Sequence, residues 1–158
     1  MMHLTKSIRL FVLLIALFFG ATGCQKDNIV PVDMITTSDD VNDDIANTTF
    51  AQTVSVTFSD NGVATVTGTD ENFNVTTNGN DVTIVYLGEE HIMYELSGSA
   101  SDGFFKLYSS SKQGITLNSL NLTNPHGAAI NVQGPTETPN KGKRTFIVLK
   151  GSNTLADG

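Results

Sequence analysis

The 158-residue chain is poor in cysteine, tryptophan and positive charge. It has one Cys and no Trp, and nine Lys and Arg against sixteen Asp and Glu give a formal net charge of −7. A single Cys excludes a disulfide framework and a cysteine-based zinc site. The acidic balance argues against nucleic-acid binding, because such proteins need a basic face to displace counterions from phosphates. The length suits one domain of ordinary size.

Long apolar runs are also scarce. The run Leu10–Phe19 has ten residues and follows Lys6 and Arg9. It is shorter than the roughly 20 residues that a membrane-spanning helix needs, and it has the length of the apolar region of a signal peptide. Together with Cys24, residues 1–23 resemble a bacterial lipoprotein signal. The resemblance implies that lipid is attached to Cys24 and that the mature chain carries a net charge of −9. A plain secretory signal is the alternative.

The segment after Cys24 is polar and acidic. Residues 25–28 resemble the short acidic tag that carries lipoproteins to the cell surface in some Gram-negative bacteria, which implies a surface-exposed outer-membrane lipoprotein. Up to about Thr49 several Asp residues lie among Thr, Ser and Asn without periodicity. The central Gly and terminal Glu of an EF-hand loop are absent. We therefore expect residues 24–50 to form a flexible acidic tether.

Apolar and polar residues alternate in short segments from residue 51 onward, which is typical of half-buried β-strands. Gly, Asn or Asp separate the segments, and no sustained apolar period of 3.6 residues follows residue 24. The sequence therefore predicts an all-β domain over residues 51–158. The expected strands lie at 54–58, 63–67, 73–76, 82–87, 92–96, 104–108, 115–117, 120–122, 129–132 and 145–149.

Two all-β architectures compete, a β-sandwich and a parallel β-helix. The turn Asp60-Asn61-Gly62 predicts an antiparallel hairpin near the start of the domain. Later, Ile115–Leu117 and Leu120–Leu122 are separated by only two residues. This spacing fits the corner of a β-helix, where the chain bends without reversing.

Six later segments match a known family in order and spacing: Asn80–Ile84, Tyr94–Gly98, Ser101–Gly103, Ile115–Asn124, Gly127–Val132 and Phe146–Gly158. Through them, residues 81–158 resemble a family of bacterial carbohydrate-binding proteins with a right-handed parallel β-helix fold, similar to pectate lyases. The resemblance implies binding of acidic plant polysaccharide such as polygalacturonate or pectin, assisted by calcium and without established cleavage. The coil of that family continues beyond its Asn-Thr-Leu-x-Asp-Gly segment, so the domain is expected to be truncated at its C-terminus.

Calcium also has a physical rationale. An anionic protein and a polyuronate repel each other unless a hard cation bridges their carboxylates. Asn153 and Asp157 are the candidate metal ligands, although two ligands fall short of the six to eight that Ca²⁺ takes. Their alternative role is that of turn residues.

The candidate sugar-binding residues are cationic or aromatic. The basic patch Lys141, Lys143 and Arg144 ends a proline-containing loop that could grip an acidic sugar, or that is a solvated insertion. Tyr108 is the candidate stacking residue, in the place of the missing Trp. Phe104, Tyr86 and Tyr94 could also stack on sugars or belong to the core.

No residue is assigned a catalytic role. The chain lacks a Gly-x-Ser-x-Gly elbow and a phosphate-binding loop. Glu89, Glu90 and His91 could form a small metal cluster, but their spacing matches no standard ligand geometry; His126 lies in a turn and is expected to be exposed. Three functions stay open: carbohydrate binding, a β-helix polysaccharide lyase with Lys106 or Lys112 as base, and a structural or adhesive surface protein.

Overall fold

The computed structural model describes residues 44–134 and 144–158, which belong to one compact unit, Ser38–Gly158. The predictions for the signal, Cys24 and most of the tether lie outside the described residues. Within them the protein is all-β, as predicted, with one 3₁₀ helix, η2 (Ile45–Asn47). The described strands are β1 (Gln52–Phe58), β2 (Thr65–Thr67), β3 (Phe73–Asn78), β4 (Asp81–Tyr86), β5 (Ile92–Ala100), β6 (Phe104–Ser109), β7 (Gln113–Asn124), β8 (Ile130–Gln133), β9 (Thr145–Lys150) and β10 (Thr154–Asp157).

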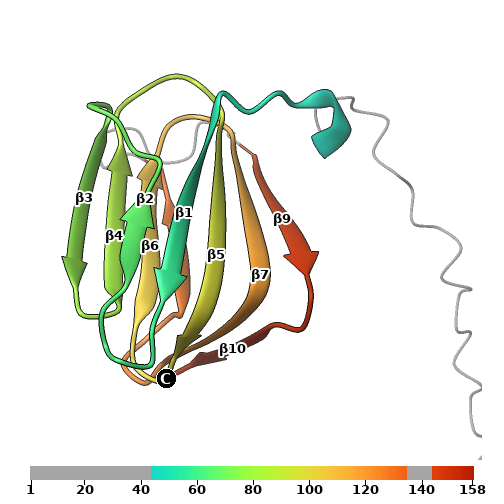
Figure 1. Cartoon of the computed structure of the whole chain (residues 1–158). Coiled ribbons are helices and arrows are strands. Elements are labelled where there is room, and N and C mark those ends of the chain that lie inside the picture. Colours follow the sequence, from blue (N-terminus) through green and yellow to red (C-terminus); the bar gives the residue numbers. More distant parts are fainter. Residues whose placement is uncertain (1–43, 135–143) are drawn as a thin grey trace, which may run out of the picture. The chain divides into compact units, whose positions relative to one another are not determined.

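The strands form two mixed sheets. Sheet A has the order β2-β1-β5-β7, and β7 pairs further with β9 and with β10. Sheet B has the order β3-β4-β6-β8. Only the β1–β2 and β3–β4 pairs are antiparallel, whereas the other described pairs are parallel. From β4 to β9 the chain passes alternately from one sheet to the other, and Figure 1 shows β1, β5, β7 and β9 side by side in sheet A.

The core lies between the two sheets because successive residues of a strand point to opposite sides. In sheet A, Val54, Tyr94 and Ile115 are aligned by the parallel registers and are all fully buried. In sheet B, Val82 and Phe105 are aligned and buried in the same way. The rings of Tyr94 and Phe105 lie 5.8 Å apart between centroids, so aromatic packing joins the two sheets.

Both antiparallel pairs lie at the start of the domain, which confirms the predicted hairpin region. Gly62 has a φ of 83° in the first connection and Gly79 a φ of 62° in the second, a region that glycine adopts without steric cost. The buried side chain of Asn80 accepts a hydrogen bond from the Ser59 backbone N–H and donates one to the Ser59 carbonyl. The Ala64 N–H donates to the Gly79 carbonyl at 2.9 Å. These bonds tie the two hairpins together.

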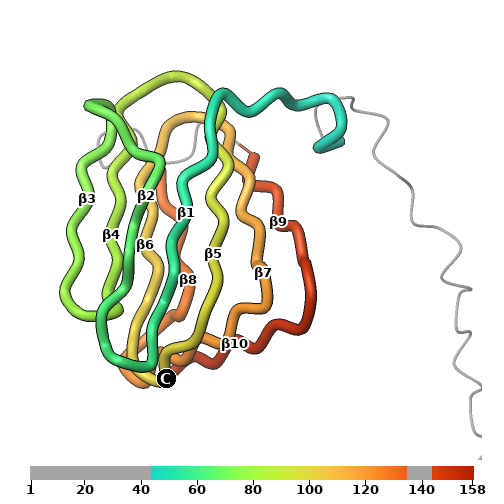
Figure 2. Tube along the Cα trace, in the orientation of Figure 1, coloured from blue at the N-terminus to red at the C-terminus, as the bar shows by residue number. Residues whose placement is uncertain are grey.

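The two short strands expected around Asn118-Ser119 are one twelve-residue strand, β7. Ser119 has a φ of 52°, and the pairing with β5 shifts register between Ser97 and Ser99. Both halves of β7 nevertheless run parallel to β5. The chain therefore bends here without reversing, as the sequence predicts, and Figure 2 shows the bend where the trace turns toward β10.

Tyr94 has a buried hydroxyl without a hydrogen-bond partner among the described residues. Leaving a buried polar group unpaired costs about 1–3 kcal/mol. We expect Tyr94→Phe, which removes the hydroxyl and keeps the ring, to raise the free energy of unfolding by about 1 kcal/mol. Urea unfolding at neutral pH measures the difference, and a variant that loses stability would show that the hydroxyl has a partner.

The Tyr94→Phe variant also tests how folding shifts the titration of the Tyr94 phenol. Burial, with a smaller contribution from Tyr86, raises the pKa of Tyr94 above its ordinary value of 10.0. A pKa that is raised by folding gives stability that is fully present below the unfolded value and lost at higher pH. The wild type should therefore lose unfolding free energy above about pH 10 more steeply than Tyr94→Phe.

Candidate functional site

The outward side of sheet B carries an aromatic ring and a cation side by side. Strand β6 buries Phe105 and Leu107, so Lys106 and Tyr108 point outward and are half-buried. The Lys106 Nζ lies 5.3 Å from the centroid of the Tyr108 ring, within the range of a cation–π interaction. This contact holds the ammonium over an aromatic surface that a ligand can reach.

Three polar residues and one valine on the adjacent strands extend this surface. Thr83 and Asn131 lie opposite Lys106, and Val85 and Gln133 lie opposite Tyr108. All are partly or fully exposed, and none carries a carboxylate. We name this set the Tyr108 face: Thr83, Val85, Lys106, Tyr108, Asn131 and Gln133. It offers a ring for stacking, amides and a hydroxyl for hydrogen bonds, and one cation.

The charges of the described residues are separated along the chain. Residues 44–105 contain nine Asp and Glu and no Lys or Arg. In the described residues from 106 onward, four cations (Lys106, Lys112, Arg144 and Lys150) stand against one carboxylate, that of Asp157. Strands β1, β5 and β7 in sheet A and β3, β4, β6 and β8 in sheet B are in chain order, so the carboxylates gather toward one end of the domain and the cations toward the other. Lys106 is the first residue of the basic part.

The outward side of sheet A has a different character. The Lys112 Nζ lies 5.7 Å from the ring of Phe146, and Asn118 donates a hydrogen bond to Glu95 at 3.2 Å. The carboxylate of Glu95 lies 3.8 Å from the Lys150 ammonium. This exposed ion pair contributes about 1 kcal/mol or less, but it puts an anion beside the cation. The Tyr108 face has no such counter-charge among its six residues.

The predicted sugar-binding residues do not form one group. Tyr108 lies at the centre of the Tyr108 face. Arg144 instead precedes β9 in sheet A, where its carbonyl accepts a hydrogen bond from the Gln113 N–H, while Lys141 and Lys143 lie outside the described residues. Tyr86 and Tyr94 are buried core residues, so they are not sugar-stacking surfaces.

In the sequence analysis Lys106 is given only as a possible base and is not placed beside Tyr108. The sequence does contain a signal for this contact. Lys106 and Tyr108 are two residues apart in one strand, so both side chains lie on the same side of the sheet.

The two candidate calcium ligands bond to the backbone of neighbouring strands. Asn153 Oδ1 accepts from the Leu120 N–H at 2.7 Å, beside the bend at Ser119. Asp157 Oδ1 accepts from the Ala129 N–H at 2.8 Å. Each of these side-chain oxygens thus bonds to the backbone of another segment, Asn153 to β7 and Asp157 to the residue before β8. Within residues 44–134 and 144–158 no group of three His, Cys, Asp or Glu could hold a metal ion, so their calcium binding stays a prediction.

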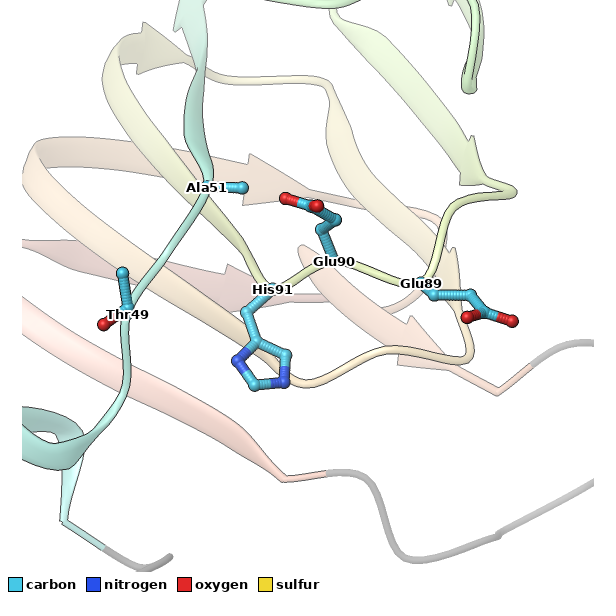
Figure 3. Close-up of a pocket in the computed structure, with 5 residues that line it drawn as sticks. All are labelled: Thr49, Ala51, Glu89, Glu90 and His91. Carbon is cyan, nitrogen blue, oxygen red and sulfur yellow. The ribbon is translucent and has the colours of Figure 1, made fainter.

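A cavity of about 330 Å³ lies where the chain enters the domain, lined by Thr49, Ala51, Glu89, Glu90 and His91. Figure 3 shows the Glu90 side chain pointing toward Ala51, while Glu89 and His91 point in other directions. The three side chains therefore do not converge on one point, and the metal cluster considered from the sequence is not formed. His126 is exposed, as expected for a turn residue.

Comparison with known proteins identifies no relative of this chain. The chain matches no protein-family model, and neither a curated protein nor a solved structure is significantly similar to it. No helix in the described part of the chain has the length and hydrophobicity of a membrane span.

Proposed function

We propose that this protein binds acidic polysaccharide through the Tyr108 face. The observation that carries the proposal is the Lys106 ammonium over the Tyr108 ring, among six outward residues that carry no carboxylate. Asp81 lies on the same side of β4, opposite Phe104. An aromatic ring packs on the apolar side of a sugar, and Asn131 and Gln133 can bond its hydroxyls. Lys106 supplies the charge that a uronate carboxylate needs.

We also propose that the fold is a right-handed parallel β-helix. The parallel pairs β5–β7 and β4–β6, and the alternation of the chain between the sheets, support this architecture. A sandwich of antiparallel sheets does not use such pairs. Parallel crossovers are right-handed in almost all proteins. In this arrangement the Tyr108 face is one continuous side of the coil.

The location proposed for this activity is the surface of the outer membrane. It rests on residues 1–23, which resemble a lipoprotein signal, and on Cys24 as the site of lipid attachment. Acyl chains contribute about 0.8 kcal/mol per buried CH₂ group, so several chains anchor a protein stably. The acidic segment 24–50 then acts as a tether between the lipid and the β domain.

Calcium is proposed to bridge the carboxylates of the protein and those of the polysaccharide, and not to be held by the protein alone. Asn153 and Asp157 each use one oxygen for a backbone N–H, and the described residues provide no cluster of three ligands. The described residues therefore offer no carboxylate cluster around which a protein-made calcium cage could be built. A bridging ion would take part of its ligands from polymer carboxylates and part from exposed carboxylates among residues 44–105.

A binding titration with polygalacturonate, with and without calcium, tests the proposal. Tyr108→Ala removes the stacking surface and should weaken binding about tenfold, since an aromatic contact is worth about 0.5–1.5 kcal/mol beyond its buried area. Lys106→Ala should weaken binding most at low salt. Phe146→Ala and Lys112→Ala are matched controls, because they remove the other ring and cation pair, on sheet A.

Equal losses in the two pairs of variants would contradict the Tyr108 face as the site. Absence of binding in both calcium conditions would contradict polysaccharide binding itself. The same samples report on the lyase alternative, because eliminative cleavage gives an unsaturated product that absorbs ultraviolet light. A constant absorbance is expected.

A further inference from the structure

The outward side of sheet B continues beyond the Tyr108 face toward the start of β6. Phe104, the first residue of that strand, points to the same side as Lys106 and Tyr108 and is also partly exposed. Phe104 and Tyr108 are four residues apart, which is about 13 Å along a strand. This distance exceeds the length of one sugar ring. A polysaccharide chain that lies along β6 therefore meets the two aromatic rings with two different sugars.

The neighbours of the two rings differ in charge. The Lys106 ammonium lies 5.3 Å from the centroid of the Tyr108 ring. Opposite Phe104, on β4, lies Asp81. Asp81 is partly exposed and points outward, because the next residue, Val82, is buried in the core. One ring therefore has a cation beside it, and the other ring has a carboxylate.

The Asp81 carboxylate has no cation opposite it in the sheet. Its neighbours across the strands are Asn78 on β3 and Phe104 on β6, and both are uncharged. The Lys106 side chain lies over the ring of Tyr108, two residues further along β6 than its own position. A uronate placed on Phe104 would bring a second negative charge beside Asp81. An uncharged sugar there can instead donate a hydroxyl proton to Asp81 and accept a hydrogen bond from the Asn78 amide.

We propose that Asp81 is a specificity-determining residue, which favours an uncharged sugar on the Phe104 ring and disfavours a uronate there. The uronate of the same chain lies on the Tyr108 ring, beside the Lys106 ammonium. This inference rests on the proposed binding of acidic polysaccharide at the Tyr108 face, and it specifies the ligand. That ligand carries both charged and uncharged sugars, as a partly methyl-esterified polygalacturonate does. Repulsion of the unwanted ligand is a usual means of separating two similar ones.

Calorimetric titration of the whole chain in detergent tests the proposal with two probes of equal length, polygalacturonate and partly methyl-esterified polygalacturonate. Both titrations contain a chelator, so that calcium does not bridge the carboxylates. The wild type should bind the esterified probe about threefold more tightly, a modest factor because exposed charges interact weakly. Asp81→Asn keeps the shape of the side chain and removes its charge. It should raise the affinity for polygalacturonate and bring the two affinities together.

Glu71→Gln is the matched control for Asp81→Asn. It makes the same change in net charge at an exposed residue before β3, whereas Asp81 pairs with the last residue of β3, Asn78. The ratio of the two affinities should stay at its wild-type value in Glu71→Gln. Phe104→Ala should weaken binding of the esterified probe more than binding of polygalacturonate, because the uncharged sugar loses its ring.

Tyr108→Ala separates this inference from the proposed function. If it weakens binding of both probes, the Tyr108 face is the site. In that case, a wild type without preference for the esterified probe, or an Asp81→Asn variant that keeps the wild-type ratio, overturns the role of Asp81 alone. Binding that Tyr108→Ala leaves unchanged, or the absence of binding to either probe, overturns both proposals.

Discussion

Replacing Gly98 by alanine should lower the free energy of unfolding by about 3 kcal/mol. Gly98 has a φ of 88°, where an L-residue costs about 1–2 kcal/mol. A β-carbon at this position would also overlap the carbonyl oxygen of Phe58 on β1, its partner in the parallel β1–β5 pair. Since that oxygen belongs to the backbone, relief requires the strands to move apart, at a further cost of about 1–3 kcal/mol.

Gly62→Ala separates these two contributions. Gly62 has a φ of 83°, almost the same as that of Gly98, but a β-carbon there meets no atom within 4 Å. Only the conformational cost applies, so we expect a loss of about 1 kcal/mol in urea unfolding. Equal losses for the two variants would show that the close approach of β1 to β5 contributes nothing.

Phe105→Ala is expected to cost about 3–5 kcal/mol of unfolding free energy, the range for a large buried aromatic side chain. Phe105 is fully buried and packs on Tyr94 across the interior, so the deletion opens a cavity between the two sheets. Such a loss is a large part of the 5–15 kcal/mol that a typical domain has. Denaturant unfolding followed by circular dichroism measures it.

Phe104→Ala is the matched control for that variant. Phe104 is the preceding residue in β6 and points to the other side of the sheet, where it stays partly exposed. Its deletion leaves no internal cavity, and the expected loss is about 1 kcal/mol or less. A larger loss for Phe104 than for Phe105 would contradict the assignment of the two sides of β6.

Local patterns were sufficient to predict most of the strands. Alternation of apolar and polar residues located β1, β4 and β5, and the Asn61-Gly62 turn predicted the β1–β2 hairpin, because these signals lie within a few residues. The pattern could not show that β7 is one strand, since its continuity depends on pairing with β5 on one side and β9 and β10 on the other. β10 was missed, because Thr154–Asp157 lacks an alternating apolar pattern.

The candidate site was predicted less completely than the fold. Tyr108 was selected as an aromatic residue on a strand, but the sequence could not separate it from Tyr94, which the packing of two sheets buries. Asn153 is a candidate calcium ligand because its side-chain amide carries an oxygen. Its bond to Leu120 joins residues 33 positions apart, so its structural role depends on tertiary contacts that no local pattern contains.

The parallel registers determine how such a chain can change in length. Gln113 pairs with Ile92, 21 residues earlier in the sequence, and Asn121 pairs with Ser99, 22 residues earlier. A single inserted residue within β7 would exchange inward and outward side chains relative to three neighbouring strands. A tandem duplication of one such 21- or 22-residue unit would add one strand to each sheet and keep the same residue register between neighbouring strands. Gene duplication can therefore lengthen this domain in whole units, whereas small insertions are tolerated only between strands.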